Sequence, residues 1–301
     1  MSPTGMTEDE RADGPHVVAL GGGHGLATTL RAARHYAGQI TAVVSVADDG
    51  GSSGRLRAEL GIPAPGDLRH CLHALTDDDS LFARAFEHRF DAGELDGHPL
   101  GNLLIAGLTS ATGNFVAALA ETGRLLGAHG TVLPATVEPV DLVADLQDGT
   151  EVRGQVQVDH AQGIAKVRLD PPAPFTPTAA LDAIAAADQI VIGPGSLHTS
   201  LLAVLAVPDI SAALHAAPAR TVFVANLRGV RSTAALTLAD HLSALADHGV
   251  TADVVVVDEN THMADGHLPS HQRIVRAPIA RFDVPAHDPA QLAKTLADLV
   301  G

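Results

Sequence analysis

The chain of 301 residues lacks the side chains that several kinds of binding site need. Its single cysteine, Cys71, excludes a disulfide framework and a thiolate metal site. There is no tryptophan, and aromatic residues make up only 3% of the chain, which argues against base-stacking platforms and aromatic carbohydrate clefts. Basic residues are also few, 19 against 35 acidic ones, and the net charge of −16 disfavours binding to nucleic acid or to an anionic membrane surface.

The sequence also lacks a recognisable targeting segment. Residues 1–15 are polar and acidic, without the basic and apolar regions of a signal peptide, and we expect them to form a disordered tail. The most apolar later stretch, residues 197–214, contains His, Ser, Pro and Asp and is too interrupted to cross a bilayer. These features predict a cytoplasmic protein in which residues 16–301 form one domain.

The order of apolar and glycine-rich segments predicts an α/β fold. A buried strand at 16–20, a glycine loop, a helix from Leu26 and a second apolar strand at 40–46 form a βαβ unit. Such a unit opens a Rossmann-like parallel sheet with helices on both faces. Residues 66–126 have helical spacing and are predicted to form a helical insertion, and residues 130–170 a small β-rich extension.

Strand and helix patterns alternate again in the last part of the chain. We expect strands at 189–192, 221–225 and 253–257, and helices at 233–248 and 289–300.

Two glycine-rich loops follow predicted strands, one in GGGHGL and one in GPGSL. Glycines let the backbone approach a phosphate, and the N-terminus of the following helix offers free N–H groups. The alternative is a tight strand-to-helix turn, since Leu26 stands where a dinucleotide fingerprint has its third glycine. The candidate anion-binding residues are Gly22, Gly23, His24, Gly25, Gly193, Gly195 and Ser196.

The segment ADDGGSSGR places acids at the end of the second strand. Asp48 lies about 20–25 residues beyond the first glycine loop, where a dinucleotide fold binds ribose hydroxyls. Asp48 or Asp49 could instead hold Mg²⁺, and Arg55 could neutralise phosphate. The alternative is a solvated turn. Gly50 and Ser52 complete this candidate group.

Three further segments contribute polar candidates. In PGDLRH, Asp67 is predicted to cap a helix, and it shares a helix face with His70, so the two could also form an acid–base pair. Arg69 lies between them. Asn102 is near a predicted helix start and Asn226 follows a predicted strand, where both could orient a ligand.

Seven motifs in this order resemble those of the gluconeogenesis factor family (YvcK type), which belongs with the CofD-like proteins. They are GGGHGL, ADDGGSSGRLR, PGDLRHCLHAL, GHPLGNLLIAGL, LPATVEPVDLVADLQDG, IGPGSLHTSLLAVL and VANL. The resemblance covers roughly residues 16–260. It implies a Rossmann-like cytoplasmic protein needed for normal cell shape and for growth on gluconeogenic carbon sources.

The resemblance also implies a ligand. It would be a nucleotide sugar such as UDP-N-acetylglucosamine or UDP-glucose, or a dinucleotide such as NAD, bound with or without Mg²⁺. The output of such a ligand sensor would be contact with a protein partner in the control of cell-wall precursors, and we expect a homo-oligomer. The alternative is a CofD-type transferase, which moves a phospholactyl-like group from a nucleotide donor. An NAD-dependent oxidoreductase is a weaker third interpretation.

The sequence departs from the family pattern at three places. His24 stands where the family usually has Thr, and His70 where Asn is usual. Residues 227–233 replace the family stretch Met-Thr-Gln-Pro-Gly-Glu-Thr, and Arg228 and Arg231 there would favour a more anionic ligand. If the His24 imidazolium touches phosphate, affinity should rise as the pH falls towards about 6.

Overall fold

The computed structural model describes residues 13–77, 80–229 and 231–301, with the side chain of Arg231 left out. Most of the expected N-terminal tail, residues 1–12, therefore lies outside the described residues.

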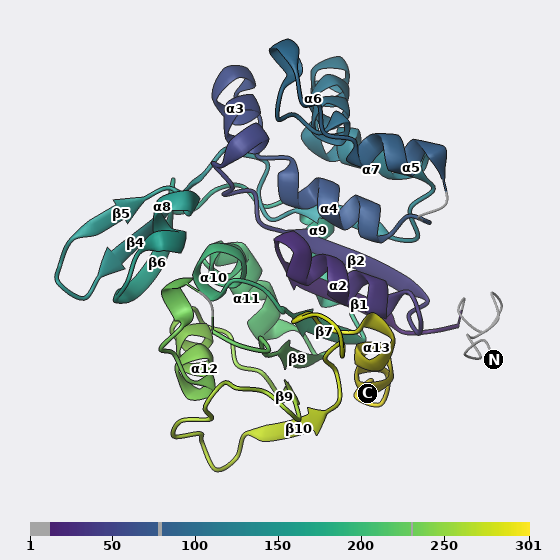
Figure 1. The fold of residues 1–301 in the computed structure, drawn as a ribbon. Coiled ribbons are helices and arrows are strands. Elements are labelled where there is room, and N and C mark those ends of the chain that lie inside the picture. The colour runs from purple at the N-terminus through teal and green to yellow at the C-terminus, as the bar shows by residue number, and fades with distance from the viewer. Residues whose placement is uncertain (1–12, 78–79, 230) are drawn as a thin grey trace.

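A parallel sheet forms the centre of the fold (Figure 1). Within the described residues it has seven strands in the order β10-β9-β8-β7-β1-β2-β3. The strands are β1 (His16–Gly21), β2 (Gln39–Val44), β3 (Thr131–Pro134), β7 (Gln189–Ile192), β8 (Arg220–Val224), β9 (Val254–Asp258) and β10 (Arg273–Ala277). The inner strands are apolar along nearly their whole length because helices cover both faces of the sheet. The predicted Rossmann-like α/β fold is thus confirmed.

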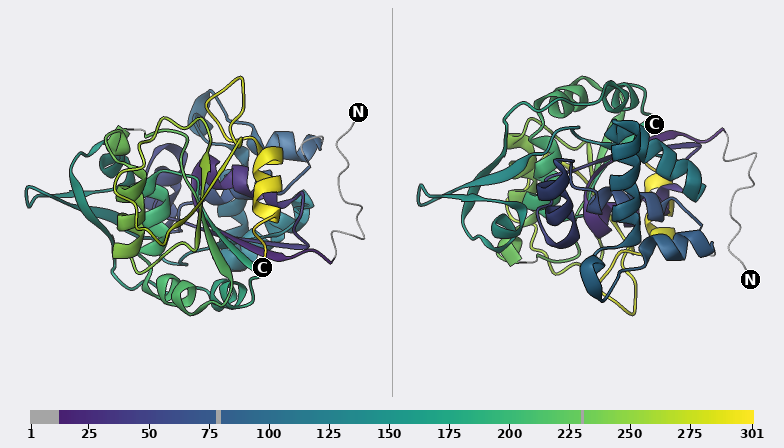
Figure 2. Two further views of the ribbon diagram at one scale, coloured as in Figure 1. Left: turned by 90° about the horizontal axis from the view of Figure 1, so that it is seen from below. Right: turned by 90° about the horizontal axis from the view of Figure 1, so that it is seen from above.

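Helices cover each face of this sheet (Figures 1 and 2). One face carries α2 (Gly23–Ala33), α4 (Gly66–Ala74) and α13 (Pro289–Ala297), and the other carries α9 (Thr178–Ala185) and α11 (Pro208–Ala216). After β7 the chain forms a π-helical turn and a short helix, and β9 is preceded by a longer helix. These are η2 (Leu197–Leu201), α10 (Leu202–Leu205) and α12 (Leu238–Asp247), with a 3₁₀ turn η3 (Arg231–Thr233) before α12.

The predicted helical insertion lies beyond one edge of the sheet, at the top of Figure 1. Its remaining helices are α5 (Leu81–Glu87), α6 (Leu100–Thr112) and α7 (Phe115–Leu126), with a 3₁₀ turn η1 (Gly93–Leu95). The structure extends the insertion to include α3 (Gly51–Leu60), which lies before the predicted bounds and packs on α6. The join between α6 and α7 follows from its sequence: Gly113 ends α6 in a left-handed conformation, and Asn114 caps α7 by accepting a hydrogen bond from the Ala117 N–H at 3.0 Å.

The β-rich extension is a separate antiparallel sheet in the order β5-β4-β6, with one helix beside it. Its elements are β4 (Asp141–Leu146), β5 (Glu151–Arg153), α8 (Gln155–His160) and β6 (Ile164–Asp170). One part of the predicted extension was wrong: residues 131–134 form β3, which pairs in parallel with β2 in the main sheet. The residue pattern of a strand does not show which sheet it joins, because the strand it pairs with lies elsewhere in the sequence.

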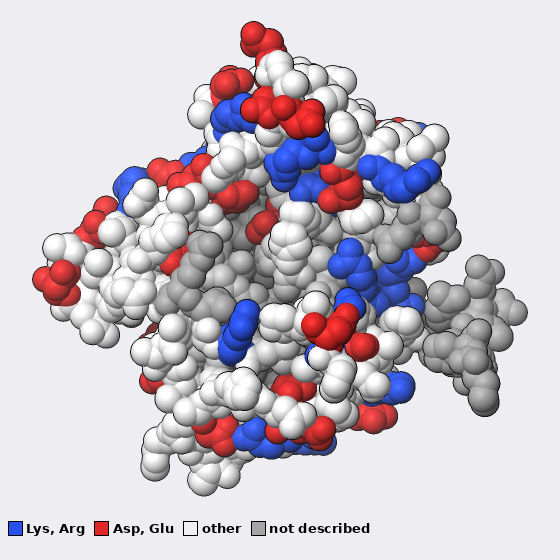
Figure 3. Space-filling view, viewed as in Figure 1, with Lys and Arg blue, Asp and Glu red and all other residues white. Residues whose placement is uncertain are grey.

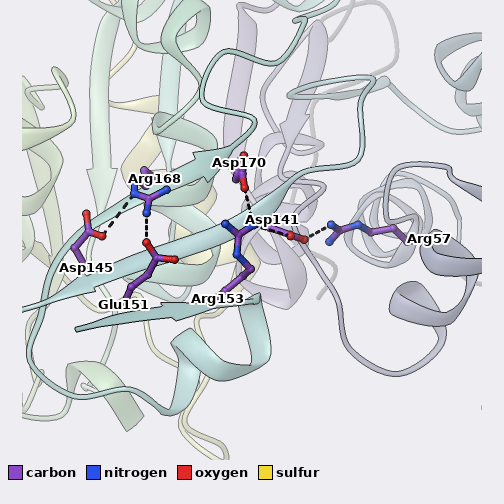
Figure 4. A network of polar contacts seen from close by, with 7 residues as sticks. All are labelled: Arg57, Asp141, Asp145, Glu151, Arg153, Arg168 and Asp170. Carbon is purple, nitrogen blue, oxygen red and sulfur yellow. Dashed lines mark hydrogen bonds and ion pairs between the residues drawn. The ribbon is translucent and has the colours of Figure 1, made fainter. Parts of the chain in front are cut away.

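Ion pairs on the exposed face of the extension hold its strands together and connect it to the insertion (Figure 4). Arg153 Nη1 lies 3.0 Å from Asp141 Oδ2 and 2.7 Å from Asp170 Oδ2. Asp141 also pairs with Arg57 of α3, so this carboxylate bridges the extension and the insertion. Although burial acts in the opposite direction, these two guanidinium groups lower the pKa of Asp141.

Other boundaries differ from the predicted ones. The first helix begins at Gly23 and not at Leu26, so the glycine loop itself forms the first helical turn. The helix expected from residue 233 begins at Leu238, because Thr237 and Asp240 form a reciprocal capping box there. Strand β10 was not predicted.

Among the described residues no single helix is long and apolar enough to cross a membrane. One pair of helical segments, Leu197–Leu205 and Pro208–Ala216, is long and apolar enough when the two are taken together, but they are bent by 74° relative to each other.

Candidate functional site

The carboxyl ends of β8, β7, β1 and β2 lie side by side, since these four strands are neighbours in the sheet. The segments that follow them therefore converge at one edge, where open α/β sheets bind their ligands. Figure 3 shows that this side of the molecule is hollowed between the insertion above and the helices below. Both glycine loops and the Asp48–Asp49 pair lie along this edge, as the sequence predicts.

The two glycine loops are in direct contact. A Cβ atom at Gly25 would collide with the carbonyl oxygen of Pro194, so only glycine allows α2 to approach the second loop this closely. One turn further on, Thr29 Oγ1 donates a hydrogen bond to the Gly193 carbonyl at 2.7 Å. The N-terminus of α2 and the second loop thus form one structural unit with two sets of backbone groups at the same edge.

Asn226, at the end of β8, fixes the second loop. Its Oδ1 accepts a hydrogen bond from the Gly195 N–H at 3.1 Å, and its Nδ2 donates to the Gly195 carbonyl at 2.7 Å. The side-chain amide therefore positions the loop. Ser196 occupies the position before the next helical turn, but its side chain makes no capping hydrogen bond.

A cavity of about 300 Å³ opens between these loops. Its wall includes His24 and Gly25 from the first loop, residues 194–196, Asn226 and Arg228. Residues 285–287 close the opposite side. His287, which the sequence did not indicate, is buried and places Nε2 3.1 Å from the Ala225 carbonyl, so it fixes this last segment to the end of β8.

The adjacent acids Asp48 and Asp49 have different partners. Asp48 Oδ1 accepts a hydrogen bond from the Gly50 N–H at 3.0 Å, within its own turn. Asp49 Oδ1 accepts one from the Val156 N–H, also at 3.0 Å, at the start of α8 in the extension. Within the described part of the chain, no group of three or more His, Cys, Asp or Glu side chains is arranged to hold a metal ion. A Mg²⁺ site here would therefore need oxygen ligands from a bound molecule.

Asp67 does not cap α4, contrary to the prediction. The helix already begins at Gly66, with Pro65 before it, so Asp67 is the second helical residue. Its carboxylate instead lies against the first glycine loop and accepts a hydrogen bond from the Gly23 N–H. Burial, together with the charge of Asp48, raises the pKa of Asp67 to about 7.

A chain of polar contacts joins residues from three predicted motifs. Ser52 Oγ accepts a hydrogen bond from Asn102 Nδ2 at 3.0 Å and lies 2.7 Å from His98 Nδ1. Asn102 Oδ1 in turn accepts one from Arg69 Nε at 3.2 Å. Arg69 also forms a partly buried ion pair with Glu87. The structure thus brings Ser52, Arg69 and Asn102 together, as a rigid group that positions α3, α4 and α6.

The predicted Asp67–His70 pair is replaced by other contacts of His70. His70 Nε2 lies 2.9 Å from Arg69 Nη2, and its ring lies 4.3 Å from the ring of His24. Burial and then the charge of Arg69 lower the pKa of His70 to about 3. His70 is therefore neutral at physiological pH and cannot supply a positive charge to the site.

Comparisons with known proteins agree with this geometry. The family model for 2-phospho-L-lactate transferase CofD matches residues 17–294. The chain belongs to the CofD family. Members of it include a protein of Bacillus subtilis named gluconeogenesis factor, which is 45% identical over 241 residues, covering 78% of this chain and 75% of that protein. The gluconeogenesis factor of Halalkalibacterium halodurans is 45% identical over 250 residues, covering 81% and 78% of the two chains.

A solved structure extends the likeness to three dimensions. A crystal structure of a UPF0052 family protein from Bacillus halodurans superposes with a TM-score of 0.88 at 37% identity, covering 94% of this chain and 99% of that one. The family resemblance drawn from the motifs is thus confirmed. In this CofD-family chain the two glycine loops and Asn226 line one cavity.

Proposed function

We propose that the chain binds a nucleotide sugar, UDP-N-acetylglucosamine or UDP-glucose, or a dinucleotide such as NAD. The observation that carries the proposal is the contact between the two glycine loops, which present backbone groups to one cavity. The diphosphate would lie against His24, Gly25 and Ser196, because backbone N–H groups at a helix start favour negative charge. Arg228 on the cavity wall would add a positive charge near the ligand.

In this proposal the protein is a gluconeogenesis factor, a ligand-sensing regulator required for normal cell shape on gluconeogenic carbon sources. The names and identities of the Bacillus subtilis and Halalkalibacterium halodurans relatives support that role. Signalling would pass through a protein partner in cell-wall precursor control, with the protein acting as a homo-oligomer. Light scattering of the purified protein with and without ligand tests the oligomer.

Mg²⁺ is proposed to enter with the diphosphate. Hard oxygen donors suit this ion, and Asp48 is the member of the Asp48–Asp49 pair that is not engaged with the extension. Magnesium bound between the phosphates and Asp48 would offset their mutual repulsion. Titration of the ligand with and without Mg²⁺ tests this, and an Asp48→Asn variant should lose the difference.

A second candidate is a CofD-type transferase, which the family model's match over residues 17–294 favours. The two functions differ in the fate of the ligand. Calorimetric titration with UDP-N-acetylglucosamine, UDP-glucose, NAD and GDP, followed by chromatography of the ligand, separates them. Saturable binding of a UDP-sugar that is recovered intact supports the sensor. Magnesium-dependent consumption of a nucleotide donor supports the transferase.

A further inference from the structure

Two arginines of the insertion converge on one short hairpin. Residues 89–99 double back on themselves, and the Phe90 N–H donates a hydrogen bond to the His98 carbonyl at 3.0 Å. Arg55 Nη2 donates a hydrogen bond to the Asp96 carbonyl at 2.6 Å. Arg89 Nη1 donates one to the Gly97 carbonyl at 2.5 Å. Both guanidinium groups are therefore held in place by backbone carbonyls.

Neither guanidinium forms an ion pair with a carboxylate in the part of the chain that the structure describes. Acidic residues nevertheless outnumber basic ones by 35 to 19 in the whole sequence. Ion pairs with carboxylates are made by Arg34, Arg57, Arg69, Arg124, Arg153, Arg168, Arg276 and Arg281. Arg55 and Arg89 are both exposed and keep further N–H donors for a ligand.

The hairpin that holds this arginine pair also contacts the candidate group, because His98 Nδ1 lies 2.7 Å from Ser52 Oγ. After burial, the charges of Arg55 and Arg89 are among the causes that lower the pKa of His98, with Glu59 acting in the opposite direction. The charge of Arg89 also acts on His70, whose ring contacts His24 of the first glycine loop. Basic and acidic side chains lie next to one another on the upper part of the hollowed face (Figure 3).

We propose that Arg55 and Arg89 form a second anion subsite, which binds a carboxylate at the sugar end of the nucleotide ligand. The inference rests on the proposed function, since the glycine loops must hold the diphosphate. A guanidinium fixed by a carbonyl retains N–H groups in a planar fork that matches a carboxylate. The ligand class is then a nucleotide linked to an acidic sugar, and the hairpin sets the distance between the two anionic ends.

UDP-glucuronate and UDP-glucose test the subsite directly, because they differ only in the carboxylate at one end. Calorimetric titration at low salt should give about tenfold tighter binding of UDP-glucuronate. The preference should shrink as salt is added, since the arginines are exposed. In Arg89→Gln the ratio of the two affinities should fall close to one.

Arg84→Gln is the matched control. Arg84 is exposed on α5 in the same insertion and makes no ion pair among the described residues, so this variant should keep the preference. Circular dichroism and thermal unfolding confirm that both variants are folded. Equal binding of the two sugars by the wild type, or an unchanged ratio in Arg89→Gln, overturns the second subsite alone. Absence of binding by both sugars overturns the proposed function and the subsite together.

Discussion

The rings of His24 and His70 lie 4.3 Å apart with their planes tilted by 43°. His24 belongs to the first glycine loop and His70 to α4, so the contact joins the loop to the insertion side of the site. These are also two of the positions at which the sequence departs from its family pattern. The two substitutions are thus neighbours in the structure, and each ring occupies space beside the other.

We expect the two histidines to be energetically coupled. Single variants His24→Thr and His70→Asn and the double variant form a cycle that isolates their interaction. Residues in contact show coupling free energies on the order of 0.5–3 kcal/mol, so the double variant should lose less stability than the sum of the singles. Urea unfolding measures this. Additive losses within about 0.3 kcal/mol would argue against the coupling.

Asp67 should make stability depend on pH. Its folded pKa of about 7 lies above the ordinary value of 3.8, so the protonated form is favoured by folding. The stabilisation from Asp67 is full below about pH 4 and is lost as the pH rises through about 7. Asp67→Asn should therefore gain stability relative to wild type between pH 5 and pH 8, by about 1 kcal/mol or more, since one pKa unit corresponds to about 1.4 kcal/mol.

Urea unfolding of both proteins at the two pH values measures that difference. Comparison within the pair removes the opposite contributions of His70 and His98, whose pKa values are lowered. A constant difference between Asp67→Asn and wild type across the range would contradict the assignment.

Asn226 should be needed for both stability and ligand binding. Asn226→Ala removes two hydrogen bonds to Gly195, with an expected loss of about 1–3 kcal/mol in the free energy of unfolding. Affinity for UDP-glucose should fall at least about tenfold, because the loop loses its fixed position. Asn226→Asp keeps the acceptor for the Gly195 N–H but places a charged oxygen against the Gly195 carbonyl, so it should lose at least as much stability as Asn226→Ala and also bind less ligand. Unchanged affinity in both variants would show that the loop does not depend on Asn226.

Gly25 should tolerate no side chain. Gly25→Ala places a methyl group against the Pro194 carbonyl, which is backbone and cannot rotate away, so the two loops must separate. We expect a clear fall in melting temperature and loss of UDP-glucose binding. Gly107→Ala is the control, because Gly107 lies in α6 with open space around it. That change should raise stability by up to about 1 kcal/mol. Equal effects of the two substitutions would contradict the close approach of the loops.

Local patterns in the sequence predicted the central part of the fold. The strand at 16–20 and the glycine loop after it are adjacent in sequence, so one short stretch contains all the residues that predict this strand–loop–helix unit. Strand β10 escaped notice because it is an edge strand whose five residues, RIVRA, are half-buried and begin with an arginine. Its place in the sheet is decided by pairing with β9.

The sequence suggested candidate site residues one by one, but it did not predict the contacts between them. His287 fixes the cavity wall through Ala225, 62 positions away, and no short motif marks it. Arg89 likewise acts through a hairpin that only the folded chain forms. Asp67 was expected to cap its own helix, yet its carboxylate contacts the glycine loop at the start of α2. Such contacts depend on the packing of separate elements, which spacing along the chain does not encode.

A crystal structure of the protein with UDP-glucose tests the central claim most directly. The account predicts the diphosphate at the edge where the two glycine loops meet, with phosphate oxygens about 3 Å from the backbone N–H groups of residues 24–25 or 196. A diphosphate bound elsewhere, or a loop pair that stays empty at saturating UDP-glucose, would contradict it.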